Sequence, residues 1–362
     1  MTTFFALDIG NKQTKLVSAK ESFVFPSVLI NKRDNKSIFA VASKPRDVFE
    51  LKLNGEHDSY YMGPGVFNFP KDRLLDSVSF EDRYGRKVYH QLNEFGLGIL
   101  AKDMPSSDLE DVKIVVGLPT GDYTVDTINE IKSIFLENVD GEFKPKTHLV
   151  TVDGKEVLTK VTSVTTLPQP IGTFYNEIFD EQLNLKDGSL VQKRIAIVDA
   201  GGGTLLLDQL SNANLEASNR VQLPSGANSL YSQISADLMQ DYRLNADLHK
   251  IETMIREGLK GNSLQTAKFV YRQSDSNIFN VTDIVVSAID HYTNTVINHI
   301  FTTFQNLREV DAMIITGGTS SILNQKLVEK AFGKSTKVIF VKNPETANAK
   351  GFYKYALLQE QN

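Results

Sequence analysis

The sequence predicts an α/β fold of two domains, and three observations support this prediction. Four short apolar runs, at residues 4–10, 112–119, 195–202 and 312–318, each end in a small or turn-forming residue, which is typical of buried strands that run into loops. Segments with helical periodicity separate these runs, and such alternation indicates an α/β architecture. The chain has 362 residues, a length that favours roughly two domains over one.

The composition is that of a globular protein with mixed surface charge. Hydrophobic residues make up 41% of the chain, enough for a large core without cross-links. The 39 basic and 44 acidic residues give a net charge of −5, which argues against a broad nucleic-acid-binding surface. Cysteine is absent, which excludes disulfides and thiolate chemistry and fits a cytoplasmic location. We find neither a signal-peptide pattern nor an apolar run of the roughly 20 residues that a membrane helix needs, so no membrane partner is expected.

Helices are expected between the apolar runs. Residues 84–102 and 281–304 carry apolar side chains at helical spacing, and residues 320–333 begin on serines that suit an N-cap and end at a glycine. Residues 31–83 are rich in charges, Gly, Pro and aromatics. We interpret them as a subdomain inserted into the first domain, although their aromatic cluster also fits a simple packed turn.

Two distant segments share one pattern. Residues 5–17 and 197–210 each read as a strand, an aspartate, one residue, a glycine, a short turn and a second strand. The aspartates are Asp8 and Asp199. Two copies of one turn predict two related domains with a cleft between them.

These turns differ from the common nucleotide-binding loops. Neither G-x-G-x-x-G nor G-x-x-x-x-G-K-[ST] is present, and β-type sequence follows Gly10 and Gly203, so each turn is predicted to be a hairpin tip whose N–H groups converge on an anion. Lys15, on the returning strand, can reach phosphates. Asp8 and Asp199 would repel phosphates unless a cation lay between, so they imply Mg²⁺ held through its waters.

Other interpretations of single features are simpler. A lone Asp-x-Gly usually marks an ordinary turn; the second copy and the further motifs below favour a phosphate site. The six histidines show no ligand spacing: His291 and His299 lie eight residues apart on a predicted helix, roughly 12 Å at 1.5 Å per residue. No Ser-His-Asp order or nucleophile elbow is present.

The ordered motifs resemble the actin superfamily of ATPases, which includes actin, the chaperone ATPase domains and the sugar kinases. Residues 7–15 and 197–207 resemble its two phosphate motifs, 167–176 its first connecting helix, 251–260 the helix along adenine and ribose, and 313–323 its adenosine motif. Residues 113–124 and 343–356 are similar to elements of the bacterial plasmid-segregation actins, the ParM/StbA group.

The resemblance implies a two-domain actin-like (ribonuclease-H-like) fold with an interdomain nucleotide cleft. Domain I would span residues 1–168, with 31–83 inserted and 340–362 returning to it as a C-terminal helix, and domain II would span 169–339. ATP or GTP with Mg²⁺ would be the cofactor, and Asp8 and Asp199 would organise the metal and its water.

The resemblance also implies roles for individual residues. Gly10, Asn11, Lys15, Gly201, Gly202, Gly203 and Thr204 would hold the phosphates, Gln169 would orient the attacking water, Arg256 and Glu257 would lie beside the base and ribose, and Gly317 and Gly318 would admit the adenosine. Some segregation actins carry Glu in place of Gln169, and Thr319 stands where some relatives have a third glycine. Gln169-Pro170 also fits a simple strand end, and Arg256 and Glu257 fit a solvated helix face.

The expected function is that of a slow, Mg-dependent ATPase that assembles head-to-tail into filaments. Slow hydrolysis is expected because a glutamine aligns water but accepts no proton at neutral pH. By resemblance, the filament would move plasmid or phage DNA through a DNA-binding adaptor at a centromere-like site. A metabolic kinase acting on a small sugar or acid is the alternative, and a chaperone would need a peptide-binding domain after the last motif.

Overall fold

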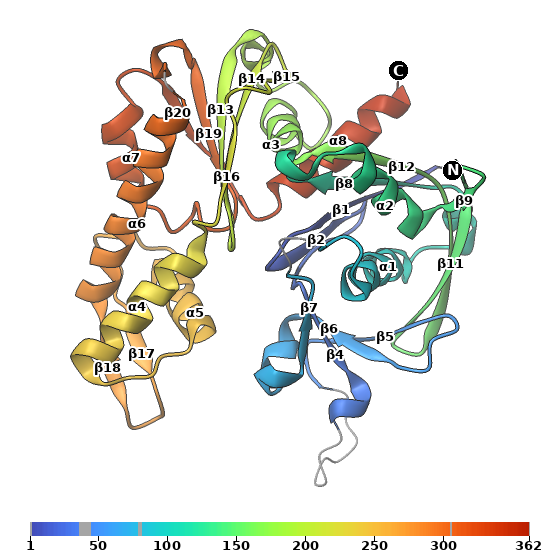
Figure 1. Cartoon of the computed structure of the whole chain (residues 1–362), viewed down its shortest axis with the longest axis horizontal. Helices are drawn as coiled ribbons and strands as arrows, with labels where there is room; N and C mark the ends of the chain where they lie inside the picture. Colours follow the sequence, from blue (N-terminus) through green and yellow to red (C-terminus); the bar gives the residue numbers. More distant parts are fainter. Residues whose placement is uncertain (1, 36–44, 79–81, 305, 362) are drawn as a thin grey trace. The chain divides into compact units, whose positions relative to one another are not determined.

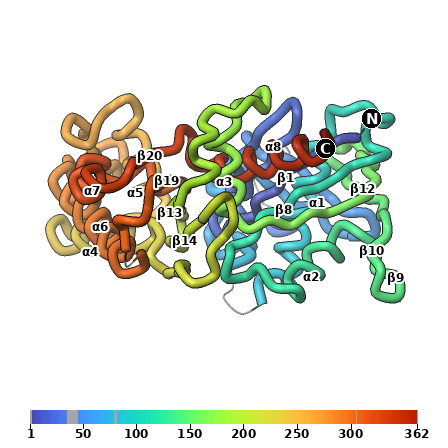
Figure 2. The backbone as a smooth tube through the Cα atoms, turned by 90° about the horizontal axis from the view of Figure 1, so that it is seen from above, coloured from blue at the N-terminus to red at the C-terminus, as the bar shows by residue number. Residues whose placement is uncertain are grey.

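The computed structural model describes residues 2–35, 45–78, 82–304 and 306–361. The backbone, drawn in Figures 1 and 2, divides into two compact units. The first unit combines Met1–Lys186 with Glu345–Asn362, and the second is the uninterrupted segment Asp187–Pro344. Each unit has a sheet of its own with helices packed on it.

The first unit contains a ten-stranded sheet. In pairing order its strands are β3 (Ser22–Pro26), β2 (Gln13–Val17), β1 (Thr3–Ile9), β8 (Val112–Leu118), β12 (Lys155–Pro168), β11 (Lys146–Val152), β5 (Phe49–Leu53), β6 (Tyr60–Met62), β4 (Val28–Asn31) and β7 (Leu74–Asp76). β1 and β12 both run parallel to β8, so the carboxyl ends of these three strands lie at one edge of the sheet. A separate hairpin joins β9 (Glu137–Val139) to β10 (Glu142–Lys144).

Helices cover both faces of this sheet (Figure 1). They are α1 (Lys87–Ala101) and α2 (Val125–Phe135) on one face, and α3 (Gln169–Ile178) and α8 (Ala347–Gln361) on the other. Successive strand residues point to opposite faces, so Phe5 and Leu7 of β1 pack in the cluster under α1, whereas Ala6 packs with Phe352 of α8. Figure 2 shows α8 beside α3.

The expected insertion at residues 31–83 forms no sheet of its own in its described part. β5 pairs with β11, and β6, β4 and β7 follow it, so these strands extend the main sheet. The aromatic turn packs inward, with Tyr61 and Val66 in a small cluster of their own. Residues 36–44 and 79–81 of the predicted insertion lie outside the described residues.

The second unit contains a six-stranded sheet. The strands are β15 (Asn214–Leu215), β14 (Leu205–Ser211), β13 (Arg194–Ala200), β19 (Ala312–Thr316) and β20 (Lys337–Phe340), with β16 (Val221–Leu223) also paired to β14. The helices are α4 (Ala227–Tyr242), α5 (Leu248–Leu259), α6 (Thr282–Thr303) and α7 (Gln325–Phe332), and a hairpin joins β17 (Val270–Arg272) to β18 (Ile278–Asn280).

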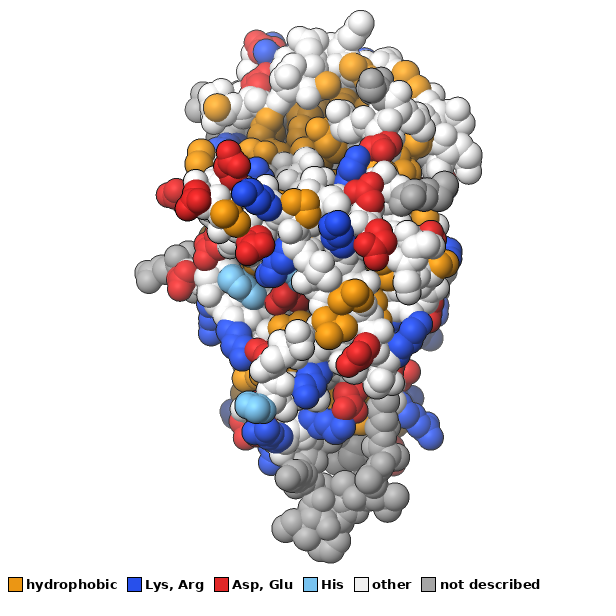
Figure 3. Space-filling view, turned by 90° about the vertical axis from the view of Figure 1, so that its right-hand side faces the viewer, with side chains coloured by type: hydrophobic (Ala, Val, Ile, Leu, Met, Phe, Trp, Pro, Cys, Tyr) orange, Lys and Arg blue, Asp and Glu red, His pale blue; other side chains and the backbone are white. Residues whose placement is uncertain are grey.

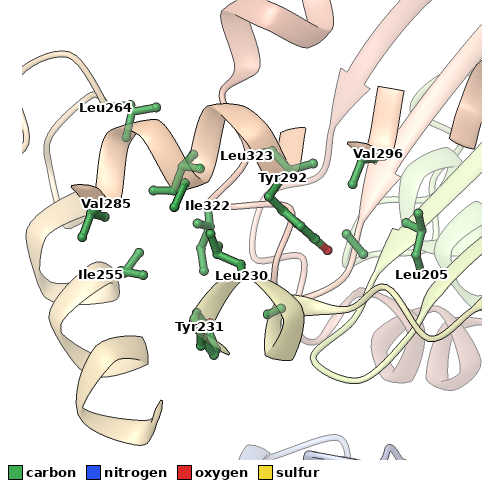
Figure 4. Packing of buried hydrophobic residues seen from close by; sticks show 14 of the residues in the cluster. Leu205, Leu230, Tyr231, Ile255, Leu264, Val285, Tyr292, Val296, Ile322 and Leu323 are labelled. Carbon is green, nitrogen blue, oxygen red and sulfur yellow. The ribbon is translucent and has the colours of Figure 1, made fainter. Parts of the chain in front are cut away.

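One large apolar cluster joins these helices to the sheet. Figure 4 shows Leu205 of β14, Leu230 of α4, Ile255 of α5 and Tyr292 of α6 within it. The Tyr292 hydroxyl donates to the carbonyl of Ser225, 2.9 Å away, which fixes the turn before α4 to α6. The core therefore sets where α4 begins.

Three sequence-based boundaries differ from the structure. The helix expected at residues 320–333 begins only at Gln325, because Ser320 and Ile322 donate backbone hydrogen bonds back into the preceding turn. The predicted changes of domain at residues 168/169 and 339/340 precede the observed changes at 186/187 and 344/345. At the first of these, α3 stays with the first unit because it packs closely on α8: a Cβ on Gly351 would lie 1.7 Å from the carbonyl oxygen of Gly172. At the second, β20 pairs with β19 and so belongs to the second unit.

The surface carries mixed charge. On the face in Figure 3, Lys and Arg side chains are interspersed with Asp and Glu. Among the described residues, no helix combines the length and apolarity that a membrane crossing requires.

Candidate functional site: two matching hairpin tips

The first hairpin tip, Gly10–Gln13, joins β1 to β2. The strands pair antiparallel, with Asp8 opposite Lys15, and the N–H of Gly10 donates to the carbonyl of Gln13 at 2.9 Å. A Cβ on Gly10 would lie 2.9 Å from that same oxygen, so the tight closure needs glycine. The predicted hairpin is confirmed.

Ser27 fixes the orientation of the first tip. This fully buried residue donates from its hydroxyl to the carbonyl of Gly10 at 2.7 Å and from its N–H to the carbonyl of Lys12 at 2.9 Å. In a trans peptide the N–H points opposite to the C=O, so the N–H groups of Asn11 and Gln13 point away from Ser27. The buried Oδ1 of Asn11 has no hydrogen-bond partner among the described residues.

Asp8 lies at the end of β1 between two donors. Its carboxylate is almost fully buried; Oδ2 lies 3.1 Å from Lys15 Nζ, and Oδ1 accepts from Gln169 Nε2 at 2.9 Å. Gln169 is the first residue of α3, immediately after β12. Because β1 and β12 end at the same sheet edge and Lys15 stands opposite Asp8 on β2, three predicted site residues meet here.

A buried arginine supports the end of β1 from the α1 side. Arg83 donates to the carbonyl of Ile9 at 2.6 Å, and its guanidinium carbon lies 5.0 Å from the ring centre of Tyr89. Burial raises the pKa of Tyr89 to about 12, so this tyrosine is neutral at physiological pH. The buried guanidinium of Arg83 therefore holds the carbonyl of Ile9, the residue between Asp8 and Gly10.

The second tip, Gly201–Thr204, joins β13 to β14. The N–H of Gly201 donates to the carbonyl of Thr204 at 2.9 Å, the same closure that Gly10 and Gln13 make. Asp199 stands two residues before Gly201, as Asp8 stands before Gly10. The repeat found in the sequence is therefore a repeat in hydrogen bonding, one copy in each unit.

The start of α4 orients the second tip. The N–H groups of Ala227 and Asn228 donate to the carbonyls of Gly201 and Gly202, at 3.2 and 3.1 Å. By the same trans geometry, the N–H groups of Gly202 and Gly203 point away from α4. Gly226, just before the helix, allows this contact, because a Cβ there would lie 2.5 Å from the carbonyl carbon of Gly203.

The glycine turn, Gly317–Thr319, follows β19 and lies against the same strand end. Gly317 has φ +84°, and a Cβ on it would lie 2.3 Å from Asp199 Oδ1. The N–H of Thr319 donates to the carbonyl of Ala200 at 2.9 Å. Gly318 lies within this turn, so the second unit brings Asp199, the second tip and both predicted adenosine glycines together.

Arg256 and Glu257 lie on α5 of the second unit. Arg256 Nε donates to Glu252 Oε1, one turn back at 3.1 Å, and Glu257 is exposed. This is the arrangement of a solvated helix face. A place for either residue beside a nucleotide rests on resemblance alone.

Each tip has the chemistry of an anion site. Convergent backbone N–H groups bind phosphate oxygens, and Lys15 adds a positive charge to the first tip. Both oxygens of Asp8 already accept from protein donors, which suits contact with a cation through water, since Mg²⁺ keeps several waters. Within the described ranges, no cluster of three or more His, Asp or Glu side chains could hold a metal alone. Phosphate oxygens and water would complete the coordination.

Two family models match consecutive parts of the chain. The model for the N-terminal domain of actin-like proteins matches residues 6–172, and the model for the Alp7A C-terminal domain matches residues 194–345. The chain belongs to the actin-like proteins. None of the curated proteins matches it in sequence. The family resemblance seen in the motifs is confirmed.

Solved structures of other actin-like proteins share the fold at low sequence identity. The apo ParM protein of psk41 is 20% identical, with a TM-score of 0.72 over 99% of this chain and 98% of that one. Bacillus thuringiensis ParM with ADP is 14% identical, with a TM-score of 0.72 over 100% and 99%. A ParM from Clostridium botulinum, solved as a 15-stranded filament, is 14% identical, with a TM-score of 0.69 over 99% of each chain.

The sequence did not reveal the residues that support the tips of this actin-like protein. Ser27, Arg83 and Gly226 each contact a tip from a distant part of the chain. Only Gly226 carries a local signal, since it stands in the turn "PSG" directly before a helical segment. The other two are ordinary residues in sequence, and only the fold brings them to the tips.

Proposed function

We propose that this actin-like protein binds ATP or GTP with Mg²⁺, hydrolyses it slowly and assembles into filaments in the cytoplasm that segregate plasmid or phage DNA. The observation that carries the proposal is the pair of hairpin tips, alike in closure and in the aspartate that precedes them. Membership of the actin-like proteins supports the use of both tips for a nucleotide.

In this proposal the two tips hold phosphates. Gly10, Asn11 and Lys15 act from the first unit, and Gly201, Gly202, Gly203 and Thr204 act from the second. Asp8 and Asp199 hold the waters of the magnesium, which supplies positive charge to the phosphates when it is bound. Gly317 and Gly318 admit the adenosine, and Arg256 and Glu257 lie beside base and ribose.

Gln169 is the proposed water-orienting residue. Its amide is anchored on Asp8 at 2.9 Å, so the carboxamide oxygen is available to accept a hydrogen bond from water. An amide takes no proton at neutral pH, and a site that positions water without a strong base is expected to be slow. Slow turnover suits a protein whose assembly lasts until hydrolysis.

Self-association is the second part of the proposal. A head-to-tail interface that does not close into a ring produces a filament, and the similar Clostridium botulinum protein was solved as one. The net charge of −5 and the interspersed charges in Figure 3 favour contact with DNA through an adaptor protein at a centromere-like site.

Light scattering and pelleting of the purified chain with Mg-ATP or Mg-GTP test the proposal. We expect nucleotide-dependent pelleting and slow phosphate release. Asp199→Ala should abolish hydrolysis, whereas Asp241→Ala, at an exposed position of α4, should leave it unchanged. Turnover that needs a small sugar or acid, without pelleting, would instead indicate a metabolic kinase.

A further inference from the structure

Thr319 connects the glycine turn to the second tip by two hydrogen bonds. Its side chain is almost fully buried. The hydroxyl donates to the carbonyl of Gly201 at 2.9 Å, and the N–H donates to the carbonyl of Ala200 at 2.9 Å. Consecutive carbonyls at the end of β13 are thus bound by one residue that follows β19.

The Gly201 carbonyl accepts a second bond from another element. Ala227 N, at the start of α4, lies 3.2 Å from the same oxygen. A carbonyl that accepts hydrogen bonds polarises its peptide and makes the N–H of that peptide a stronger donor. The peptide in question carries the N–H of Gly202, one of the two that point away from α4.

The glycine turn also has little freedom to move independently of the tip. Gly317 packs so closely that a Cβ on it would lie 2.3 Å from Asp199 Oδ1 and 2.4 Å from the carbonyl oxygen of Ala200. A displacement of this turn would therefore be transmitted to Asp199 and, through Thr319, to Gly201.

We propose that Thr319 is a positioning residue for phosphate binding: its hydroxyl fixes the Gly201–Gly202 peptide so that the Gly202 N–H faces the nucleotide phosphates. The inference rests on the proposed nucleotide site and deepens it. Thr319 touches neither substrate nor metal in this role. It acts on the second tip from the glycine turn, and so links the two parts of the site within one unit.

The alternative is that Thr319 only fills space, and two substitutions separate the two roles. Thr319→Val keeps the branched shape and loses the hydroxyl, whereas Thr319→Ser keeps the hydroxyl and loses the methyl group. If packing is what matters, Thr319→Ser is the more damaging change. If the hydrogen bond matters, Thr319→Val is the more damaging change.

The experiment measures the affinity for Mg-ATP by calorimetry and the melting temperature of each variant. We expect Thr319→Val to bind about threefold to tenfold more weakly, because the Gly202 N–H then donates poorly to phosphate and the loss of one such hydrogen bond to the ligand has about this effect. Thr319→Ser should bind within about twofold of the parent chain. Thr336→Val is the matched control, because Thr336 is a buried threonine of the same unit whose hydroxyl donates to the Leu307 carbonyl. Its affinity should not change.

The outcomes are distinguishable. Equal affinity in all variants, or weaker binding by Thr319→Ser than by Thr319→Val, overturns the inference and leaves the proposed function standing. Absence of Mg-ATP and Mg-GTP binding by the parent chain overturns the proposed function itself. Should Thr319→Val fail to fold, Thr319→Ala replaces it, since Thr319→Ala and Thr319→Ser differ only in the hydroxyl; equal binding by these two also overturns the inference.

Discussion

At the scale of single residues, the contact between Gln169 and Asp8 yields the first prediction. Gln169→Ala removes the amide that donates to Asp8 Oδ1 and should lower the rate of phosphate release by on the order of tenfold to a hundredfold, because misplacement of a reacting water costs such factors. The affinity for nucleotide should change less than about threefold, since Lys15 and the tip N–H groups are retained.

The control for Gln169→Ala is Gln91→Ala, which removes another buried glutamine of the same unit, one that donates to Glu56. Its turnover should match the parent chain after correction for the folded fraction. Equal rates in Gln169→Ala and the parent would show that the Gln169–Asp8 contact is only structural.

A second residue-scale prediction concerns acid stability. Asp111 accepts from the hydroxyls of Thr162 at 2.6 Å and Thr2 at 2.8 Å, and these bonds lower its pKa. A carboxyl whose folded pKa lies below the unfolded value of about 3.9 adds stability that is present above that value and is lost as pH falls through the folded pKa. Thr162→Val should therefore destabilise by about 1 kcal/mol at pH 7.

Urea unfolding at pH 7, 5 and 3.5 measures this effect. The stability difference between Thr162→Val and the parent chain should be constant between pH 7 and 5 and smaller at pH 3.5, where Asp111 of the unfolded chain is mostly protonated. Thr147→Val, at an exposed position of β11, is the control and should show no such trend. A difference that is the same at all three pH values would contradict the assignment.

At the scale of elements, α3 and α8 cross very closely at two glycines, Gly172 and Gly351. A Cβ on Gly351 would lie 1.7 Å from the Gly172 carbonyl oxygen, an atom of the backbone that cannot turn aside. Gly351→Ala should therefore destabilise by about 1–3 kcal/mol or more through overpacking. In Gly96→Ala the nearest atom is a methyl carbon of Leu16, which can move, so the loss should be smaller. Chemical denaturation measures the free energy of unfolding of both variants. An equal loss of stability in Gly351→Ala and Gly96→Ala would contradict this explanation.

Some elements could be predicted from the sequence and others could not. The two hairpins were predictable because an aspartate, a glycine and two apolar strands are local signals. Gln169 became a candidate because its motif is contiguous, and its role in the site stays a prediction. The start of α7 was not predictable: Ser320 is a good N-cap by type, but its N–H donates to the Gly317 carbonyl and Thr293 on α6 accepts from the N–H of Asn324. The contact between Asn324 and Thr293 joins residues far apart in sequence, as do those of Ser27 and Arg83 with the first tip.

At the scale of the whole molecule, the chain begins and ends in the same unit. The second unit is one continuous segment, whereas the first is completed by α8. Phe352 of α8 fills the space left by two glycines, since a Cβ on Gly117 or Gly172 would lie 2.1 or 2.5 Å from its ring. Lys354, almost fully buried, donates to the Phe179 carbonyl at 3.0 Å, at the end of α3.

Truncation after Pro344 should therefore damage one unit and spare the other. Loss of α8 exposes Ala6, Val115 and Leu167 of the first sheet to water. Truncation of a buried side chain such as that of Phe352 to alanine already lowers stability by about 3–5 kcal/mol. In the part of the chain that the structure describes, the cluster of α4, α5, α6 and α7 on the second sheet contains no residue of α8. Limited proteolysis with mass spectrometry should find new cleavage sites concentrated in residues 1–186. New sites spread equally over residues 187–344 would show that the second unit also depends on α8.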